Sequence, residues 1–519
     1  MKCFVILVSL LMGFSSETSS TDSALYLTSY IKRNETSKAR ILSAVDPNKF
    51  LNIHSHSGFL TVDEKYNSNL FFWYFPARPP NNKTDIPWIL WLQGGPGATS
   101  MFGLFSEMGP LQWKNDHLEA RKYAWSKQCS MLFIDNPVGA GFSFTNHKNG
   151  TPNNLNETAQ HLLSALEQFL QVFPEQRTAP FYIAGESFAG RYAPALAQKI
   201  MESKLKINMT GLILGNPIIN HIDIANFTSL FYFWSMIDDQ GAKEAKPYQD
   251  AYYQALKSND SITADDAHNQ LLDELESIAD HHNDYNALVD VKPDRSFEDF
   301  ITRPEIQDAL HVGRIKFTFS NQTKLRVEFL TDMTPTVETL LNHYRILIYC
   351  GQLDLVTWCA GAAGARRGWA WARAGDFRAA ARRPWWRGNT LAGYSKSGGG
   401  LTEVLVRNAG HIVPSDRPAE AFQMISSFLH YRPLPTAPYD IADDVTTPAP
   451  STTTTTTTNK PVIVTQSSIG AGVITSITLN VVLVAAIMII VLQYWRKKRR
   501  AEDFYYTEDS LSDGILTMS

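Results

Sequence analysis

Residues 181–200 read FYIAGESFAGRYAPALAQKI. The first four residues are apolar or aromatic, as in a buried strand, and residues 191–200 have the apolar spacing of a helix. Between these segments, Gly185-Glu186-Ser187-Phe188-Ala189 places a serine among small residues. A sharp strand-to-helix turn leaves little room for side chains and holds such a serine at the carboxyl end of its strand. The stretch therefore predicts a serine nucleophile on an α/β sheet.

Further short apolar runs end in turn residues in the same way. They are WILWL (88–92), MLFID (131–135), LILG (212–215), RILIYC (345–350) and EVLV (403–406). Helical spacing recurs at residues 162–173 and 419–429. Strands that alternate with helices and are apolar on both faces predict a doubly wound, mostly parallel α/β sheet. Ligands of such sheets bind beyond the carboxyl ends of the strands.

A serine nucleophile requires a base and a carboxylate that orients the base. His411 follows the run at 403–406, and Asp354 follows the run at 345–350. A lone Asp or His is more often structural, but the order Ser187, Asp354, His411 is that of the α/β-hydrolases. The Phe188 N–H and the turn Gly94–Gly97 can supply backbone donors for an oxyanion. These residues predict a catalytic triad.

Six motifs follow one another along the chain: WLQGGPGATS (91–100), EMGP (107–110), FIDNPVGAGFSF (133–144), AGESFAGRYAP (184–194), GQLD (351–354) and NAGHIVP (408–414). In their order and spacing they resemble the motif set of the serine carboxypeptidases. The chain resembles this family over about residues 25–430. Gln rather than Asn before the GGPG turn resembles the vitellogenic-carboxypeptidase-like subgroup.

The resemblance implies a serine-type carboxypeptidase that releases C-terminal amino acids from peptides through an acyl-enzyme. It implies that Gly95 and Phe188 form the oxyanion hole, and that a helical insertion at about 217–325 covers the site. It assigns the substrate carboxylate to Gln93, Gly94, Glu107 and Glu186. Paired, buried carboxyls raise each other's pKa, so a protonated Glu donates a hydrogen bond in mild acid. No metal or organic cofactor is implied.

Two other functions fit the same fold. One is a catalytically inactive α/β-hydrolase ectodomain used for adhesion. Inactive relatives typically lose the nucleophile or the base, whereas this chain retains Ser187, Asp354 and His411. The other is an esterase or acyltransferase. An ester needs no carboxylate clamp, so Gln93 and the two glutamates favour the carboxypeptidase.

The ends of the chain carry membrane signals. Residues 1–20 have the pattern of a signal peptide, and residues 21–435 contain the catalytic domain. A Thr/Pro-rich stalk (436–468) precedes 24 uncharged residues (469–492), enough for about 36 Å of helix. RKKRR at 496–500 lies near the start of the tail (493–519) and predicts a single-pass type I protein with a cytoplasmic tail. Such a stalk is either a flexible linker or O-glycosylated.

Asparagine-linked glycosylation sites agree with this topology. The predicted sites, Asn34, Asn82, Asn149, Asn156, Asn208, Asn226 and Asn321, precede the span. The secretory pathway is therefore the expected compartment, with the Golgi, lysosome and plasma membrane left open. A net charge of −4, from 47 basic and 51 acidic residues, excludes the basic character of a nucleic-acid-binding protein. A homodimer is compatible with the sequence.

The chain departs from the family in two places. Ala98-Thr99-Ser100 stands where many members have Cys-Ser-Ser, so the disulfide formed there is absent. Cys129, Cys350 and Cys359 remain after signal removal, and one thiol must stay unpaired in a monomer. Residues 358–387 hold ten Ala, seven Arg and five Trp. This composition admits a basic-aromatic nucleic-acid patch, but a divergent helical segment or a sequence error next to Asp354 is the preferred interpretation.

Overall fold

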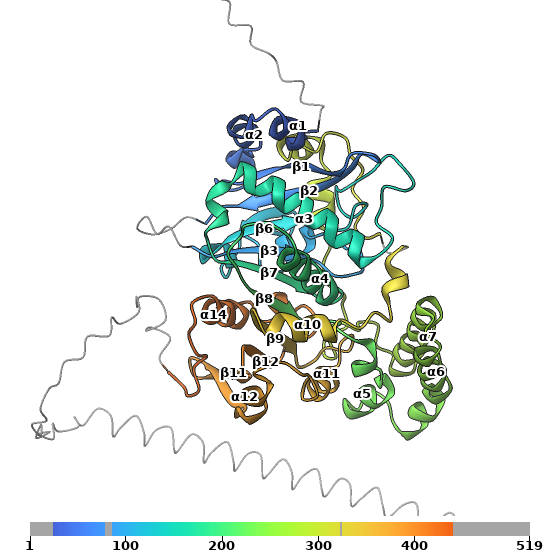
Figure 1. Cartoon of the computed structure of the whole chain (residues 1–519). Coiled ribbons are helices and arrows are strands. Elements are labelled where there is room, and N and C mark those ends of the chain that lie inside the picture. Colours follow the sequence, from blue (N-terminus) through green and yellow to red (C-terminus); the bar gives the residue numbers. More distant parts are fainter. Residues whose placement is uncertain (1–23, 78–85, 322–323, 440–519) are drawn as a thin grey trace, which may run out of the picture. The chain divides into compact units, whose positions relative to one another are not determined.

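The computed structural model describes residues 24–77, 86–321 and 324–439. Its framework is a ten-stranded sheet with the strand order β1-β2-β6-β3-β7-β8-β9-β12-β11-β10 (Figure 1). The strands are β1 (His56–Asp63), β2 (Ser68–Phe75), β3 (Trp88–Leu92), β6 (Ser130–Ile134), β7 (Phe181–Glu186), β8 (Met209–Gly215), β9 (Arg345–Gly351), β10 (Arg383–Arg387), β11 (Thr390–Gly398) and β12 (Leu401–Val406). A separate hairpin pairs β4 (Leu111–Lys114) with β5 (His117–Ala120).

The centre of the sheet is parallel and both of its edges are antiparallel. Strands β6, β3, β7, β8, β9 and β12 pair in parallel. Strands β1 and β2 form one antiparallel edge, and β11 and β10 form the other. The six runs predicted from the sequence are the six parallel strands, so the expected doubly wound α/β sheet is confirmed.

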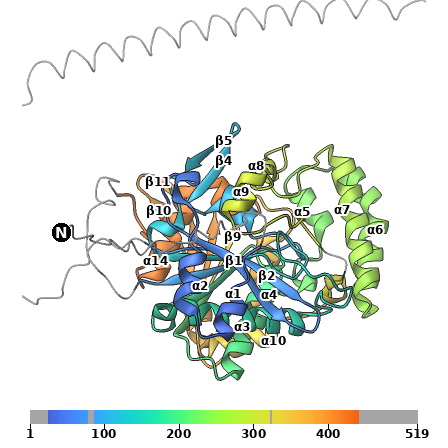
Figure 2. The same ribbon diagram turned by 90° about the horizontal axis from the view of Figure 1, so that it is seen from above.

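Two apolar layers cover the sheet because successive side chains of a strand point to opposite faces. On β3, Trp88, Leu90 and Leu92 pack with α3 and α4, whereas Ile89 and Trp91 pack with α14. Figure 2 shows α3 and α10 on one side of the sheet and α8 and α9 on the other.

The α-helices are α1 (Leu27–Lys32), α2 (Thr36–Leu42), α3 (Leu155–Val172), α4 (Ala189–Glu202), α5 (Phe227–Phe233), α6 (Asp239–Lys257), α7 (Ser261–Ala279), α8 (Phe297–Ile301), α9 (Pro304–Ala309), α10 (Thr334–Leu341), α11 (Cys359–Arg366), α12 (Ala374–Ala379), α13 (Val413–Asp416) and α14 (Pro418–Leu429).

Short helical turns complete the described segments. The 3-10 turns are η1 (Pro47–Lys49), η3 (Trp125–Lys127), η4 (Pro174–Arg177), η5 (His221–Ile224) and η6 (Leu325–Glu328). A π-helical turn, η2 (Gly103–Glu107), ends at one of the predicted site glutamates. π-helical turns occur frequently at functional sites.

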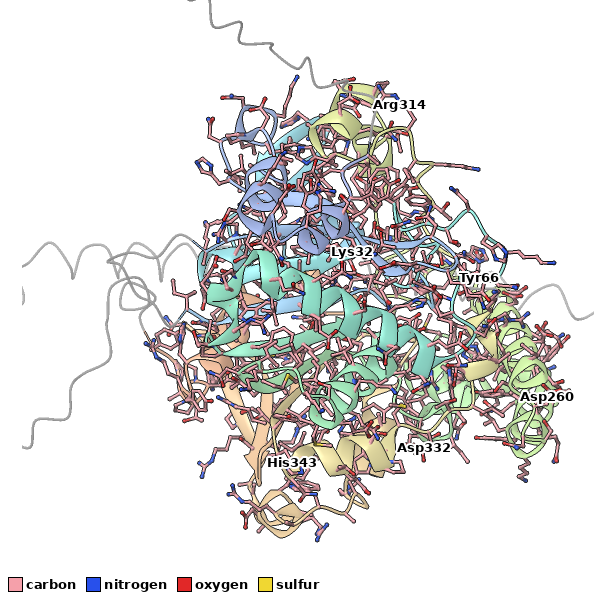
Figure 3. The ribbon with its side chains drawn as sticks, turned by 45° about the horizontal axis from the view of Figure 1, so that its top comes forward. Lys32, Tyr66, Asp260, Arg314, Asp332 and His343 are labelled. Carbon is pink, nitrogen blue, oxygen red and sulfur yellow. A yellow bond between two sulfur atoms is a disulfide. The ribbon has the colours of Figure 1, made fainter. Side chains whose placement is uncertain are left out.

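The chain leaves the sheet after β8 and returns at β9. In between, α5, α6 and α7 share an apolar cluster of their own, and α6 and α7 lie side by side (Figure 1). Asp260, labelled in Figure 3, caps α7 by accepting hydrogen bonds from the backbone N–H groups of Ile262 and Thr263. Helices therefore occupy the stretch in which a helical insertion was expected.

Residues 358–387 are only partly helical. Helices α11 and α12 lie between residues 359 and 379, but the segment then forms the edge strand β10, which corrects the expected helical segment. Trp369, Trp371 and Trp385 are buried, and Arg366 pairs with Glu403. Three of the five tryptophans are thus packed in the core and do not form an exposed aromatic surface for nucleic acid.

The predicted membrane signals lie outside the described residues. This applies to the signal peptide (1–20), the stalk beyond residue 439, the span (469–492) and the tail (493–519). Among the helices within residues 24–439 that the structure describes, none combines the length and the apolar character needed to cross a bilayer.

Candidate active site

Ser187 occupies a strained turn between β7 and α4. Its φ is 59°, in the left-handed region that non-glycine residues seldom adopt. A Cβ added to Gly185 would lie 2.5 Å from the Cβ of Ala189 and 2.7 Å from the carbonyl oxygen of Leu92. Only glycine fits there, so the small residues in the sequence pattern are required by the tight approach of α4 to the sheet. Strain of this kind at a serine is typical of a nucleophile elbow.

Asp354 and His411 follow β9 and β12, which are neighbouring parallel strands. Their side chains meet with 3.0 Å between Nδ1 of His411 and Oδ2 of Asp354. The backbone N–H of His411 donates to the carbonyl oxygen of Tyr285 at 2.6 Å, and the Tyr285 ring stacks on the imidazole at a centroid distance of 5.3 Å. The imidazole is therefore oriented by a carboxylate and by the inserted segment.

Several donors surround the carboxylate of Asp354. Its Oδ1 accepts from the backbone N–H groups of Val356 at 2.8 Å and Thr357 at 3.2 Å. Its Oδ2 accepts from the Asn216 side-chain amide at 2.5 Å and from the Thr357 hydroxyl. Burial raises the pKa of Asp354, but the charge of His411 and these hydrogen bonds lower it below its ordinary value. Burial lowers the pKa of His411. The Asp354 carboxylate raises it by more than burial lowers it, so the pKa of His411 lies above its ordinary value.

A disulfide closes the loop that carries Asp354. It joins Cys350, in β9, to Cys359, the first residue of α11. Cys129 is the free thiol, and it is buried. The three cysteines thus divide into one pair and one unpaired residue, with the pair on either side of Asp354.

The Gly94–Gly95 turn packs against Ser187. A Cβ on Gly94 would lie 2.7 Å from the Cβ of Ser187 and 2.9 Å from the backbone nitrogen of Phe188. Gly95 has a φ of 110°, which glycine adopts easily. Helix α4 begins at Ala189, so the Phe188 N–H has no carbonyl partner within the helix. The two peptide groups predicted to form the oxyanion hole therefore lie beside the serine.

Gln93, Glu107 and Glu186 form a buried cluster. The Gln93 side-chain amide donates to Oε1 of Glu107 at 3.1 Å and to Oε1 of Glu186 at 3.0 Å. The indole N–H of Trp91 donates to Oε1 of Gln93 at 2.9 Å and fixes which way this amide points. In the described chain, Oε2 of each glutamate has no donor, and the two carboxyls are within hydrogen-bonding contact of each other. A proton held by one carboxyl can therefore be donated to the other.

Burial dominates the protonation of this cluster. It raises the pKa of Glu107 to about 7. It raises the pKa of Glu186 well above the usual value, and the negative charge of Glu107 adds to that rise. Two buried carboxyls that share one amide donor cannot both ionise at low cost. The pair therefore retains a proton in acid and up to about neutral pH.

One cavity of about 770 Å³ joins these parts. Ser187 and His411 line it together with Gln93, Glu186 and the two oxyanion-hole candidates, Gly95 and Phe188. Asp354 lies behind His411, and Glu107 lies behind Gln93 and Glu186, each with almost no exposed surface. The inserted segment forms another part of the wall, with His221, Asp265, His268, Leu272 and Tyr285.

The predicted glycosylation sites differ in exposure. Asn34, Asn149, Asn156 and Asn208 are exposed. Asn226 and Asn321 are half-buried, and the side chain of Asn226 caps α5 by accepting from the Ser229 N–H. Asn82 lies outside the described residues.

Three residues near the triad were not predicted. Asn216 directly follows the run at 212–215, so a polar residue at a strand's carboxyl end was a usable signal. Thr357 lies three residues after Asp354, a spacing that permits a local hydrogen bond. Tyr285 lies in the inserted segment, and no motif marks it.

Comparisons with known proteins agree with this geometry. The family model described as serine carboxypeptidase matches residues 46–431. Venom serine carboxypeptidase of Apis mellifera is 36% identical over 427 residues, covering 78% of this chain and 91% of the relative. Vitellogenic carboxypeptidase of Aedes aegypti is 35% identical over 424 residues, covering 78% of this chain and 90% of the relative.

A solved structure supports the fold. Kex1ΔP, a prohormone-processing carboxypeptidase from Saccharomyces cerevisiae, superimposes with a TM-score of 0.66 at 23% identity, covering 76% of this chain and 96% of the yeast chain. At this identity the likeness shows a common fold. The family match and the two insect relatives show more, and by them the chain belongs to the serine carboxypeptidase family.

Proposed function

We propose that this serine-type carboxypeptidase uses Ser187 as nucleophile, His411 as general base and Asp354 to orient His411. The observation that carries the proposal is the position of the Gln93–Glu186 pair in the same cavity as Ser187 and His411. A nucleophile beside a site built for a carboxylate has the geometry needed to cleave the last peptide bond of a chain. The substrates are peptides or proteins with a free C-terminus.

The reaction follows from the positions of these groups. The Ser187 hydroxyl attacks the scissile carbonyl carbon while His411 accepts its proton. The backbone N–H groups of Gly95 and Phe188 donate to the oxyanion that forms. His411 then gives the proton to the leaving amino group, and water hydrolyses the acyl-enzyme by the same steps. Asp354 remains ionised throughout and stabilises the imidazolium, in agreement with its lowered pKa.

The substrate's C-terminal carboxylate binds to Gln93, the Gly94 backbone and the protonated carboxyl of Glu186. Glu107 acts through Glu186 because it does not line the cavity. A neutral Glu186 donates a hydrogen bond to the carboxylate, whereas an ionised one repels it. Peptide binding therefore requires the proton that the buried pair retains below about neutral pH.

This cluster also separates the proposal from its alternatives. An esterase has no use for a buried proton-sharing pair next to its nucleophile, because an ester substrate brings no carboxylate. An inactive adhesion ectodomain has no need of the strained φ of Ser187 or of the four groups that donate to Asp354 besides His411.

Replacing the nucleophile tests the proposal. Ser187→Ala should lower kcat by about 10⁵- to 10⁶-fold, as for other triad serines, with an unchanged Tm. Release of the C-terminal residue from blocked dipeptides by the purified full chain measures it. Ser320→Ala is the matched control, because Ser320 lines the same cavity and its hydroxyl donates to the Pro96 carbonyl at 3.3 Å. Equal turnover by Ser187→Ala and wild type would exclude Ser187 as the nucleophile.

We further propose a type I membrane topology with the catalytic domain in the lumen of the secretory pathway. The support is the uncharged segment 469–492, the following RKKRR and the sequons, all of which precede the span. In sealed microsomes, residues 21–468 should resist added protease while the tail is cleaved. The exposed Asn34, Asn149, Asn156 and Asn208 should carry glycans. Digestion of the large fragment in intact vesicles contradicts this orientation.

A further inference from the structure

A second cavity of about 460 Å³ lies at the opposite end of the sheet from the catalytic site. Arg345, the first residue of β9, lines it, whereas Asp354 follows the other end of that strand. The seven residues of β9 span about 20 Å at roughly 3.3 Å per residue. His343, labelled in Figure 3, lies two residues before Arg345 at this end. The two cavities have no lining residue in common.

Three arginines line this cavity without a carboxylate. Arg345, Arg383 and Arg432 come from β9, β10 and the segment after α14, and we call the cavity the three-arginine pocket. No Asp or Glu lines it, and none of the three arginines forms an ion pair within the described ranges. Elsewhere in the described ranges, arginines such as Arg366 and Arg373 pair with acids.

Arg345 is held in place by stacking. Its guanidinium carbon lies 4.0 Å from the ring centroid of Phe428 and 3.9 Å from that of Tyr431. One guanidinium nitrogen, Nη1, is buried, and the Tyr182 hydroxyl interacts with this guanidinium. The planar guanidinium is thus oriented in advance for an acceptor.

Hydroxyl groups complete the lining. Ser395, Ser397, Thr402 and Ser427 contribute donors, and Ser397 and Thr402 already contact each other at 2.9 Å. Guanidinium groups bind tetrahedral oxyanions through paired N–H donors, and hydroxyls add further hydrogen bonds. Like charges gathered without a counter-ion repel one another, so a bound dianion also relieves this repulsion.

We propose that the three-arginine pocket binds a phosphate or sulfate monoester. The charge selects the oxyanion, and the volume leaves room for a small organic group attached to it, against the exposed ring of Tyr431. Free inorganic phosphate and an ester carried on a sugar present the same oxyanion. This site is distinct from the peptidase cavity and does not depend on the proposed function.

Titration of the full chain with defined probes tests the proposal. Inorganic phosphate, inorganic sulfate, glucose 6-phosphate and glucose are added at constant ionic strength, and binding is followed by calorimetry and by Tm. Glucose 6-phosphate should bind with a dissociation constant below about 1 mM. At a concentration about one hundred times that constant it should raise Tm by about 2 °C, whereas glucose should do neither. Tighter binding of the ester than of inorganic phosphate indicates a carried oxyanion, and equal binding indicates the free ion.

Matched variants locate the site. Arg383→Gln with Arg432→Gln should weaken binding at least tenfold while peptidase activity stays unchanged, because neither residue lines the catalytic cavity. Arg367→Gln is the control, since Arg367 is exposed and lies outside the pocket. The absence of binding by all three oxyanion probes overturns the proposal. An equal loss in Arg367→Gln also overturns it, because the attraction would then come from general surface charge.

Discussion

Asp354 and Glu186 are both buried carboxyls beside the catalytic cavity, yet their protonation differs. Asp354 accepts from two backbone N–H groups, an amide, a hydroxyl and His411, and its pKa is lowered. Glu186 accepts from a single amide, which it shares with Glu107, and its pKa is raised. Burial acts on both in the same direction. The neighbouring charge and the number of donors together decide which carboxyl is a charge and which is a proton donor.

This difference separates two tasks within one site. An ionised Asp354 stabilises the imidazolium, and a protonated Glu186 donates to the substrate. A protonated Asp354 would not stabilise the imidazolium, and an ionised Glu186 would not donate to the substrate. Changing the donors or the charge at one position should therefore disturb one limb of the pH profile and leave the other limb in place.

The largest effect is expected from Asp354→Asn. An amide can present its NH₂ to His411 and favour the wrong imidazole tautomer, so kcat should fall by about 10⁴-fold. Steady-state kinetics on a blocked dipeptide measures this loss. Asp416→Asn is the control, because Asp416 lies five residues from His411 in the chain and accepts from the Gly410 N–H at 2.7 Å. A comparable loss in both variants would show that general disruption around His411, and not the tautomer, causes the effect.

A smaller, pH-dependent effect is expected from Glu186→Gln. The raised pKa values mean that the proton is present below about neutral pH and lost as the pH rises through them. In wild type, KM for a peptide should therefore increase on the alkaline side. A glutamine keeps an oxygen for Gln93 and donates from its NH₂ without titrating. The variant should consequently retain peptide binding at higher pH, with its KM up to about tenfold below that of wild type there.

A peptide amide sharpens this experiment. The amide lacks the carboxylate, so wild type should bind it weakly and without the alkaline increase in KM. His411, with its raised pKa, still has to be neutral, so the acid limb of kcat should be shared by both substrates. Identical KM profiles for a peptide and its amide in wild type contradict the carboxylate-binding role of Gln93 and Glu186.

The sequence predicted the three triad residues better than the hydrogen bonds that surround them. Strand ends and chain order were enough to predict Ser187, Asp354 and His411, because parallel strands bring their carboxyl ends to one edge. The donors around Asp354 come from separate segments, such as Asn216 after β8 and Thr357 in the β9–α11 loop. Their convergence depends on loop conformation, which periodicity does not encode. The roles of Gln93, Glu107 and Glu186 came from the family resemblance, and their hydrogen bonds came from the structure.

The sequence predicted the centre of the sheet but not its edges. All six parallel strands were predicted, since continuous apolar runs mark strands buried on both faces. The antiparallel edges were not. Strand β2 was not recognised although it is buried throughout, and β10 lies in the Ala-, Arg- and Trp-rich stretch 358–387, whose composition suggested helix. Trp385 is buried within that strand, so packing against the core overrode local composition.

The smallest effect is expected from Thr357→Val, which changes the Asp354 side of the comparison alone. Valine keeps the shape but removes the hydroxyl that donates to Oδ2. With one donor fewer, the charge of Asp354 is less dispersed and attracts the His411 proton more strongly. The pKa of His411 should rise, so the acid limb of kcat/KM should move to higher pH, with a roughly three- to tenfold loss of activity below that limb. The alkaline limb should stay where it is, because Gln93, Glu107 and Glu186 are untouched. Thr336→Val, which removes a half-buried hydroxyl donating to Gln198 at 3.2 Å, should leave both limbs unchanged. Movement of the alkaline limb in Thr357→Val would mean that the two carboxyl environments are coupled, and that the surroundings of each carboxyl do not set its protonation independently.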